Sequence, residues 1–401
     1  MSKIAAETTA ADPVVIVAAA RTPMGGFQGD LSGVSAPELG AIAVKAAADR
    51  AGLSTGAVDE IFMGCVLSAG LKQAPARQAA LLAGLADNTA ATTVNKMCGS
   101  GMRAAMMAYD SLMLGHNDVI IAGGMESMTN APYLLTKARS GYRIGHGEVK
   151  DHMYLDGLED AYEGRLMGSY AEDTAKAYQF TREMQDAYAI ESLRRAQHAV
   201  REGLFADEIV PVTVKTRKGD VEVVRDEQPL KGDETKIPTL KPAFARDGTV
   251  TAANASSISD GAAALVMMRL SEAESRGLAP LAVIRGHTSH ANAPAWFSTA
   301  PIHAMSRLFD RTGWNVDNVD LFEINEAFAV VTMAAMKECN IPHEKLNIHG
   351  GATALGHPIG ASGARIIVTL LNAMKQRDAK RGVAAICIGG GEATAMALER
   401  I

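Results

Sequence analysis

The amino-acid sequence predicts an α/β protein built from two similar halves, with a long insertion after the first half. Strand-like and helix-like segments alternate near both ends of the chain, and three short segments of the first third recur near the C-terminus. The region between them differs in composition. With 401 residues, of which 48% are apolar, the chain is long enough for two or three folding units of about 150 residues each.

The first half alternates strands with helices. The run Val14–Ala20 is short, β-branched at its start and closed by Arg21-Thr22-Pro23, which is typical of a buried strand. A helix is predicted over Ala36–Ala51, because apolar residues recur at helical spacing and Gly52 follows as a stop signal. The further predicted elements are a strand at 61–66, a helical stretch around 81–85, a strand at 91–94, a helix at 101–114 and a buried strand at 119–124.

From about residue 129 to 257 the chain becomes more charged, which indicates an inserted domain. It contains one clear helix, Thr181–Glu202, that begins with the capping pattern Thr181-Arg182-Glu183. Residues 221–248 are rich in charge and are predicted to form a solvated loop region. The predicted division is a first half at 1–128, an insertion at 129–258, a return to the first half at 259–279 and a second half at 280–401.

An internal repeat supports the two halves, because self-similarity over a long range indicates a duplicated architecture. The offsets between the three matched pairs, 261, 262 and 266 positions, differ only by small insertions. Chance similarity between segments rich in alanine and glycine is the alternative. The pairs are 51–53 and 58–61 with 312–314 and 319–322, 99–103 with 361–365, and 122–126 with 388–392.

The charge balance excludes some classes of partner. Lysine and arginine number 39 and aspartate and glutamate 45, so the formal net charge is −6. The chain therefore lacks the basic excess that neutralises nucleic-acid phosphates or an anionic membrane surface. No apolar run approaches the roughly 20 residues of a membrane helix, so we expect neither nucleic acid nor membrane as a partner.

The cysteines and the start of the chain indicate the compartment. Cys65, Cys98, Cys339 and Cys387 are too few and too widely spaced for a disulfide framework, and they fit a reducing compartment. Residues 1–13 lack the apolar core of a signal peptide and the arginines of a transit peptide, so they are expected to form a short disordered tail. We predict a cytoplasmic protein.

Cys98 is the candidate nucleophile. It stands in Asn95-Lys96-Met97-Cys98-Gly99-Ser100-Gly101, between a predicted strand and a predicted helix. The positive end of the helix dipole favours thiolate over thiol, and the glycines let a substrate approach the backbone closely. Backbone amides in such a turn can hold an oxyanion. A small buried hydrophobe is the alternative interpretation of this cysteine.

His357 is the candidate general base. It is the one histidine of the glycine-rich loop Gly350–Gly363. Pro358 restricts the backbone at His357, and an imidazole fixed in a glycine-walled pocket suits a base near neutral pH. A solvent-exposed loop histidine is the alternative.

Cys387 and Asn325 complete the candidate site. Cys387 precedes three glycines and follows a predicted strand at 383–386, at the end where α/β enzymes gather their sites. Asn325 can donate a hydrogen bond to a developing oxyanion, with a helix cap as the alternative. Cys65 and Cys339 lack glycine turns and are predicted to be packing residues. No metal is expected, because structural zinc usually needs Cys-x-x-Cys pairs.

Four blocks together resemble the signature motifs of the thiolase family. The similarity spans nearly the whole chain and is closest to the acetyl-CoA acetyltransferase group of that family. The blocks are residues 95–101, 325–328, 356–363 and 387–391, with further similarity at Gln73–Gln78 and Asn254–Ser256.

The resemblance implies a five-layered αβαβα fold of two similar halves. It also implies that the inserted loop domain binds coenzyme A and that the chain forms a homodimer or homotetramer. Coenzyme A, acetyl-CoA and acetoacetyl-CoA are implied as substrates and products, and no cofactor is expected.

The roles of the site residues are implied by their positions in the motifs. Cys98 would take the acyl group, His357 would activate Cys98, and Cys387 would act as acid and base. Asn325 with His357 would stabilise the enolate oxygen of the second thioester, and the amides of Cys98 and Gly389 would hold the oxyanion of the tetrahedral intermediate. The implied neighbours of the pantetheine and the acyl group are Met167, Ser256 and Phe328.

The implied reaction is a ping-pong Claisen condensation of two acetyl-CoA to acetoacetyl-CoA and CoA, with thiolysis as its reverse. A 3-ketoacyl-CoA thiolase of broader or longer chain preference is the nearest alternative, and a non-catalytic acyl-CoA-binding protein is a remote one. A condensing enzyme that uses acyl carrier protein is disfavoured, because such enzymes have histidine at the position of Cys387. Departures at Leu166, Leu230, 298–301 and His349 leave the pocket shape and the acyl-chain preference open.

Overall fold

The computed structural model describes residues 12–401, so most of the predicted N-terminal tail lies outside the described residues. The first half contains the strands β1 (Val14–Arg21), β2 (Gly25–Gly26), β3 (Glu60–Gly64), β4 (Ala90–Val94) and β5 (Val119–Ser127), and the helices α2 (Ala36–Arg50), α3 (Pro75–Leu82) and α4 (Ser100–Met113).

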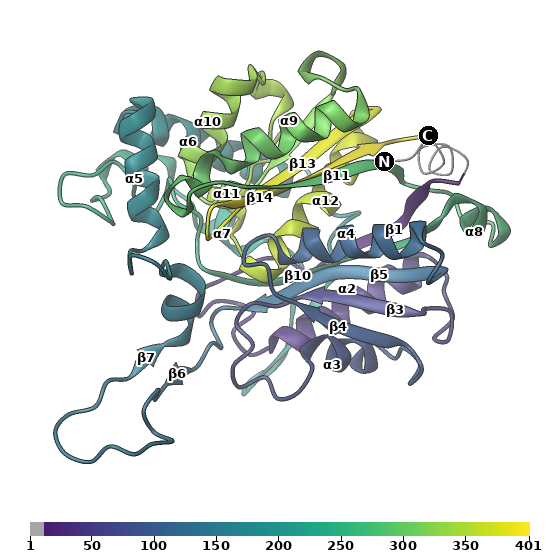
Figure 1. Ribbon diagram of the computed structural model, residues 1–401, viewed down its shortest axis with the longest axis horizontal. Coiled ribbons are helices and arrows are strands. Elements are labelled where there is room, and N and C mark those ends of the chain that lie inside the picture. Colours follow the sequence, from purple (N-terminus) through teal and green to yellow (C-terminus); the bar gives the residue numbers. More distant parts are fainter. Residues whose placement is uncertain (1–11) are drawn as a thin grey trace.

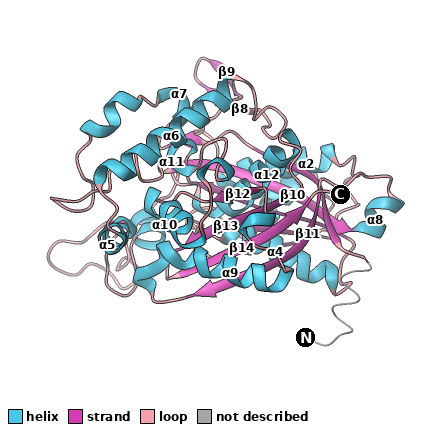
Figure 2. Cartoon of the chain, turned by 90° about the horizontal axis from the view of Figure 1, so that it is seen from above, coloured by secondary structure: helices cyan, strands magenta, loops and turns pink. Residues whose placement is uncertain are grey.

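The inserted region follows β5. It contains β6 (Tyr133–Leu134), β7 (Lys150–Asp151), the π-helix η1 (Tyr154–Leu158), α5 (Met167–Tyr178), α6 (Arg182–Arg201), β8 (Val212–Thr216), β9 (Gly219–Val223), α7 (Glu227–Lys231) and the 3-10 helix η2 (Glu234–Thr239). Figure 2 shows α6, α7 and the β8–β9 hairpin along one side of the molecule.

The remaining chain completes the core. It contains β10 (Ser259–Arg269), α8 (Leu270–Ser275), β11 (Ala282–Ala291), η3 (Pro294–Thr299), α9 (Ala300–Thr312), η4 (Val316–Asn318), β12 (Leu321–Ile324), α10 (Ala329–Cys339), η5 (His343–Lys345), α11 (Ala352–Leu355), α12 (Ile359–Gln376), β13 (Arg381–Ile388) and β14 (Glu392–Glu399). Strand β10 returns to the first half and lies between β1 and β5. The four-part division of the chain stays a prediction.

The main-path strands follow the order β12-β13-β14-β11-β1-β10-β5-β3-β4. Only two residue pairs join β1 to β11, Val15 with Val283 and Ile16 with Ala282, so the path divides there into two sheets. Helices α4 and α12 pack together between these sheets, α2 and α3 cover one outer face, and α9 and α10 cover the other (Figure 1). The predicted five-layered αβαβα fold is confirmed.

Three apolar clusters hold the layers together. One lies between α2, α3 and the first sheet, where Leu39 and Val44 meet Ile121. The second surrounds the central helices and takes Ile120 from the first sheet and Ile386 from the second. The third lies under α9 and α10. Alternate residues of one strand face different clusters, as the period of two in a strand requires.

The strand register corrects one of the repeat matches. Glu60 pairs with Ile120 in the first sheet, and its counterpart Leu321 pairs with Gly382 in the second, so β5 and β13 correspond at an offset of 262. The match between 122–126 and 388–392 is therefore wrong by four positions. The two glycine segments serve different purposes: Gly124 lies inside β5, where a Cβ would be 2.1 Å from the oxygen of Gly360, whereas 389–391 form a turn.

Two other predictions, the loop at 221–248 and the strand position of Cys65, need correction. The solvated loop predicted at 221–248 is wrong in part, since it includes the end of β9, α7 and η2. Asp226 and Glu227 are buried there because they accept hydrogen bonds from the backbone of Met24 and Gly26. Cys65 was predicted within a strand but follows β3, and it is buried as expected for a packing residue.

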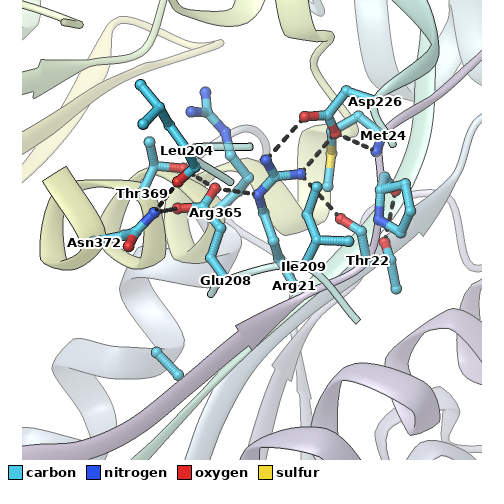
Figure 3. Close-up of polar contacts among 12 residues, drawn as sticks. Arg21, Thr22, Met24, Leu204, Glu208, Ile209, Asp226, Arg365, Thr369 and Asn372 are labelled. Atoms are coloured by element: carbon cyan, nitrogen blue, oxygen red, sulfur yellow. Dashed lines mark hydrogen bonds and ion pairs between the residues drawn. The ribbon is translucent and has the colours of Figure 1, made fainter. Parts of the chain in front are cut away.

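Arg21 at the end of β1 connects the insertion to the core. Its guanidinium is fully buried and donates to Glu208 at 2.5 Å and to both oxygens of Asp226 at 2.7 and 2.9 Å (Figure 3). Glu208 also accepts hydrogen bonds from Thr369 and Asn372 of α12, each at 3.1 Å. Burial lowers the pKa of Arg21, but Asp226 and Glu208 raise it by more, so Arg21 stays charged.

Within residues 12–401, no helix is both long enough and apolar enough to cross a membrane.

Substituting Arg21 tests this network. We expect Arg21→Met to lower the free energy of unfolding by about 3–5 kcal/mol, because it leaves two buried carboxylates without their cation. Lys45→Met is the control: Lys45 pairs with Asp49 on the exposed surface of α2, and an exposed pair contributes about 1 kcal/mol or less. Denaturant unfolding measures both. Equal losses in the two variants would contradict the structural role of Arg21.

Candidate active site

Cys98 lies in the tight turn that leads into α4. Met97 has a positive φ of 47°, and the Ser100 hydroxyl stabilises the turn by donating to the Met97 oxygen at 2.6 Å and accepting from the Lys96 amide at 2.8 Å. Gly99 packs on the turn after β13, where a Cβ would be 2.3 Å from a side-chain carbon of Ile388. Cys98 as a whole is half-buried, just before the N-terminus of α4.

Two backbone amides act on the Cys98 sulfur. Burial raises the pKa of the thiol to about 11, although the N–H groups of Gly389 and of Cys98 itself lower it by donating to the thiolate. The resting thiol is therefore protonated and needs a base. The same two donors are placed where they can stabilise negative charge on an atom bound at the sulfur.

Cys387 is the second thiol of the site. It is buried on β13, and its pKa is raised well above the ordinary value, first by burial and then by the negative charge of Cys98. The residues next to the two cysteines touch, because Gly99 packs on Ile388. Because of its raised pKa, Cys387 keeps its proton at rest and can donate it to a leaving group.

The hydrogen bonds of His357 fix its tautomer. Ser362 lies 2.6 Å from Nδ1 and also donates to the carbonyl oxygen of Pro358 at 2.9 Å. Because a hydroxyl has a single proton, Ser362 accepts from Nδ1–H. The lone pair of Nε2 is then free to act as a base.

The surroundings keep His357 neutral. Burial and then the positive charge of Arg365 lower its pKa to about 3. The backbone N–H of His357 donates to the Ser257 oxygen at 3.1 Å and to the Ser259 hydroxyl at 3.2 Å. The histidine is buried, so the exposed-loop interpretation is wrong. It makes no direct hydrogen bond to Cys98 within the described chain, but Ile359, two residues on, packs in a cluster with Cys98.

Asn325 lies beside His357. Its Nδ2 is 3.5 Å from each ring nitrogen, and its buried Oδ1 has no protein partner within residues 12–401. The helix-cap interpretation is wrong, because α10 begins at Ala329 after Phe328 and no side chain caps it. The backbone N–H of Asn325 donates a hydrogen bond to the Ala385 oxygen at 2.9 Å, which holds the residue in place.

The buried carboxylate of Glu326 supports the turn next to Asn325. It accepts hydrogen bonds from Tyr188 and Ser192 of α6 at 2.8 Å, and from the hydroxyl of Thr353 at 2.6 Å. It thereby joins the insertion, the end of β12 and the glycine-rich loop before His357.

The three predicted substrate neighbours lie around the same site. Met167 begins α5, with its sulfur 3.8 Å from the position of a Cβ on Gly389. Ser256 donates its amide to the Ala327 oxygen at 2.9 Å, and Phe328 forms a β-bridge with Ala255. The structure therefore brings Gly389 against Cys98 and Met167, and Asn325 against His357. Ser256 and Phe328 lie on two paired segments of chain.

Sequence reasoning missed residues that support the site. Ser362 belongs to the block 356–363, but no role is predicted for it from the sequence. Its spacing of five residues from His357 is the signal that could have indicated one. Glu126 accepts hydrogen bonds from the amides of Val66, Leu67 and Gly360 at 3.0, 3.1 and 2.9 Å. An acidic residue at the end of an apolar, glycine-rich strand was its only signal.

These features define a class of protein. Two neighbouring thiols, a neutral imidazole and two converging amides suit acyl transfer through a cysteine. No three His, Cys, Asp or Glu side chains of the described chain converge as a metal site would need.

Comparisons with known proteins agree with this class. The family model described as "Thiolase, N-terminal domain" matches residues 14–271, and "Thiolase, C-terminal domain" matches residues 278–400. The chain belongs to the thiolase family.

Curated relatives and a solved structure cover nearly the full length. Acetyl-CoA acetyltransferase of Escherichia coli is 50% identical over 96% of this chain and 99% of its own. The enzyme of that name from Cupriavidus necator is 47% identical over the same shares. The crystal structure of the Acat5 thiolase from Ascaris suum in complex with coenzyme A has a TM-score of 0.93 and 42% identity, covering 97% of this chain and 100% of that one.

Removing the Ser362 hydroxyl tests the tautomer of His357. We expect Ser362→Ala to lower the rate of thiolysis by about tenfold to a hundredfold, because Nε2 then carries the proton more often and a positioned general base contributes about 10²–10⁴-fold. Steady-state kinetics measures the effect. Thr369→Val is the control on the same helix, since Thr369 bonds Glu208 instead. An unchanged rate in Ser362→Ala would contradict this assignment.

Proposed function

We propose that this chain is an acetyl-CoA acetyltransferase, which condenses two acetyl-CoA to acetoacetyl-CoA and CoA and catalyses the reverse thiolysis. The observation that carries the proposal is that Cys98, before α4, and Cys387, near the end of β13, lie on chain segments in contact, since Gly99 packs on Ile388. The Gly389 amide also acts on the Cys98 sulfur. The names of the relatives, which align over nearly their whole length, support the substrate.

In the first half-reaction Cys98 takes the acetyl group. His357 Nε2 removes the thiol proton, and the thiolate attacks the carbonyl carbon of acetyl-CoA. The amides of Cys98 and Gly389 stabilise the oxyanion of the tetrahedral intermediate. When the carbon–sulfur bond to CoA breaks, the Cys387 thiol protonates the departing sulfur. The products are acetyl-Cys98 and CoA, with His357 protonated and Cys387 ionised.

In the second half-reaction the Cys387 thiolate removes an α-proton from another acetyl-CoA. Asn325 and the protonated His357 donate hydrogen bonds to the enolate oxygen, which matters because a thioester is a weak carbon acid. The enolate carbon attacks acetyl-Cys98 to give acetoacetyl-CoA. Cys98 leaves as a thiolate and takes its proton back from His357, which restores every group.

A groove supports the binding of coenzyme A. Its lining includes the exposed Lys231 and Lys236 and the partly buried Ser257 and Thr353. The Ser257 carbonyl oxygen accepts a hydrogen bond from the backbone N–H of His357, so the groove lies beside the site. The positive charge of the two lysines suits the phosphates of coenzyme A. The Ascaris suum thiolase, crystallised with coenzyme A, supports this ligand. Leu230, one of the departures, lies outside this lining.

Aromatic packing supports a short acyl group. Phe328 has edge-to-face contacts with Phe244 and Phe297, at ring distances of 6.1 and 6.2 Å. Gly168 packs on the Phe244 ring, and Ser298 bonds Thr174 of α5. These contacts fix α5 and fill space next to Ser256.

We also propose a homodimer or homotetramer in the cytoplasm that needs no cofactor. Strand β4 ends the sheet path and its outer edge has no partner within residues 12–401, which invites pairing with a second chain. The β6–β7 hairpin projects from the body (Figure 1) with exposed Tyr133, Leu135 and Ile144. The free cysteines fit a reducing compartment, and every step above uses protein groups alone. Light scattering measures the mass in solution.

Cys98→Ala tests the nucleophile. With acetyl-CoA, the parent chain should gain one acetyl group in the intact-mass spectrum, and Cys98→Ala should gain none because the attacking sulfur is gone. An adduct retained in Cys98→Ala would place the nucleophile elsewhere.

Cys387→Ala tests the acid/base. We expect acetyl-Cys98 to form in this variant, because Cys98 and His357 remain, but no acetoacetyl-CoA to appear, because the α-proton stays in place. Mass spectrometry follows the adduct and absorbance follows the product. Condensation at the parent rate would rule out this role for Cys387.

The acyl-chain preference is tested by thiolysis rates. We expect kcat/KM with acetoacetyl-CoA to exceed that with a 3-ketoacyl-CoA of longer chain, because the aromatic rings limit the space. The reverse order would favour a 3-ketoacyl-CoA thiolase of longer chain preference.

A further inference from the structure

An ion pair joins the two turns that meet at the nucleophile. Lys96, two residues before Cys98, contacts the carboxylate of Glu392, three residues after Gly389. Their side chains are only 24% and 36% exposed. The pair therefore links the first half of the fold to the second, next to the reacting sulfur.

The turn at 389–391 joins β13 to β14 and is closed at its base by the pairing of Ile388 with Glu392, which also pairs with Ala291 of β11. Gly390 and Gly391 have φ angles of +90° and +86° and carry no side chains that could fix the turn. On the far side Asn292 donates its amide to the Gly391 oxygen at 2.8 Å. On the side that faces Cys98, Gly99 packs directly on Ile388. The ion pair of Lys96 and Glu392 is a second link between the two segments.

We infer that Lys96 and Glu392 are positioning residues that hold the Gly389 amide in line with the Cys98 sulfur. Neither residue touches the reacting atoms. The inference rests on the proposed role of Cys98. An oxyanion donor acts only within about 2.7–3.1 Å of the developing charge, and a misplacement of about 1 Å can cost about 10²-fold in rate.

If Lys96 and Glu392 acted on Cys98 only through their charges, the variants would behave differently. Glu126 is a charged group that acts on the Cys98 sulfur, and the substitutions leave it unchanged. Removing only Glu392 would leave the Lys96 cation near the sulfur and favour the thiolate. The double variant Lys96→Met/Glu392→Gln removes both charges, so a purely electrostatic effect largely cancels, whereas a loss of positioning remains.

The experiment follows the pH dependence of Cys98 alkylation by iodoacetamide, with the Cys98 peptide quantified by mass spectrometry. In Lys96→Met/Glu392→Gln we expect the midpoint to rise by about half a pH unit or more, because the Gly389 amide no longer favours the thiolate. We expect kcat for thiolysis to fall by about tenfold to a hundredfold with KM changed less than about threefold.

Two further variants make the result specific. The exchanged pair Lys96→Glu/Glu392→Lys should recover most of the lost kcat, which a role of either residue in substrate binding would not allow. Glu399→Gln is the control, because Glu399 pairs with Arg285 and Arg381 at the other end of β14. It should leave the alkylation midpoint of Cys98 unchanged.

The outcomes separate this inference from the proposed function. The positioning role would be overturned if the double variant had the same alkylation midpoint and the same kcat as the parent chain. A raised KM with unchanged kcat would overturn it as well. Failure of the parent chain to form acetyl-Cys98 would instead overturn the proposed function, and alkylation would still report the geometry of the turns.

Discussion

The buried guanidinium of Arg21 determines how the insertion sits on the core. A charge without water must be paired, and the partners of Arg21 come from two points of the insertion, Glu208 and Asp226. Through Glu208 the same network reaches the central helix α12. Once the insertion is fixed in this way, its helix α6 can support Glu326 and, next to it, Asn325 of the site.

Buried carboxylates then hold the turns of the site, and the reacting groups are left free. Glu126 binds the amide at the start of α12, and Glu326 binds the loop before His357. Burial raises the pKa of Glu126 to about 7, although three amides oppose this. Because these carboxylates take up backbone donors, the turns are held by groups other than the side chains of Cys98 and His357.

Much of this organisation was accessible from local sequence signals. The apolar residues located β1, which is buried along nearly its whole length, and the helices α2 and α4. Glycine-flanked positions located Cys98, His357 and Cys387. The third repeat match failed because a glycine pair that admits a neighbouring backbone inside a strand looks the same as a glycine pair in a turn. Glu126 and the partners of Arg21 act across distances in sequence that no local pattern encodes, whereas Ser362 acts five residues from His357.

The corrected register of the repeat has a consequence for the number of reactive centres. At an offset of 262, the position equivalent to Cys98 in the second half is Gly360. A Cβ there would lie 2.6 Å from an oxygen of Glu126 and 2.9 Å from the oxygen of Met125, so no thiol fits, and the amide that would receive an oxyanion is already bound. The duplicated fold offers two matching helix starts, but of these two only the first has room for a thiol.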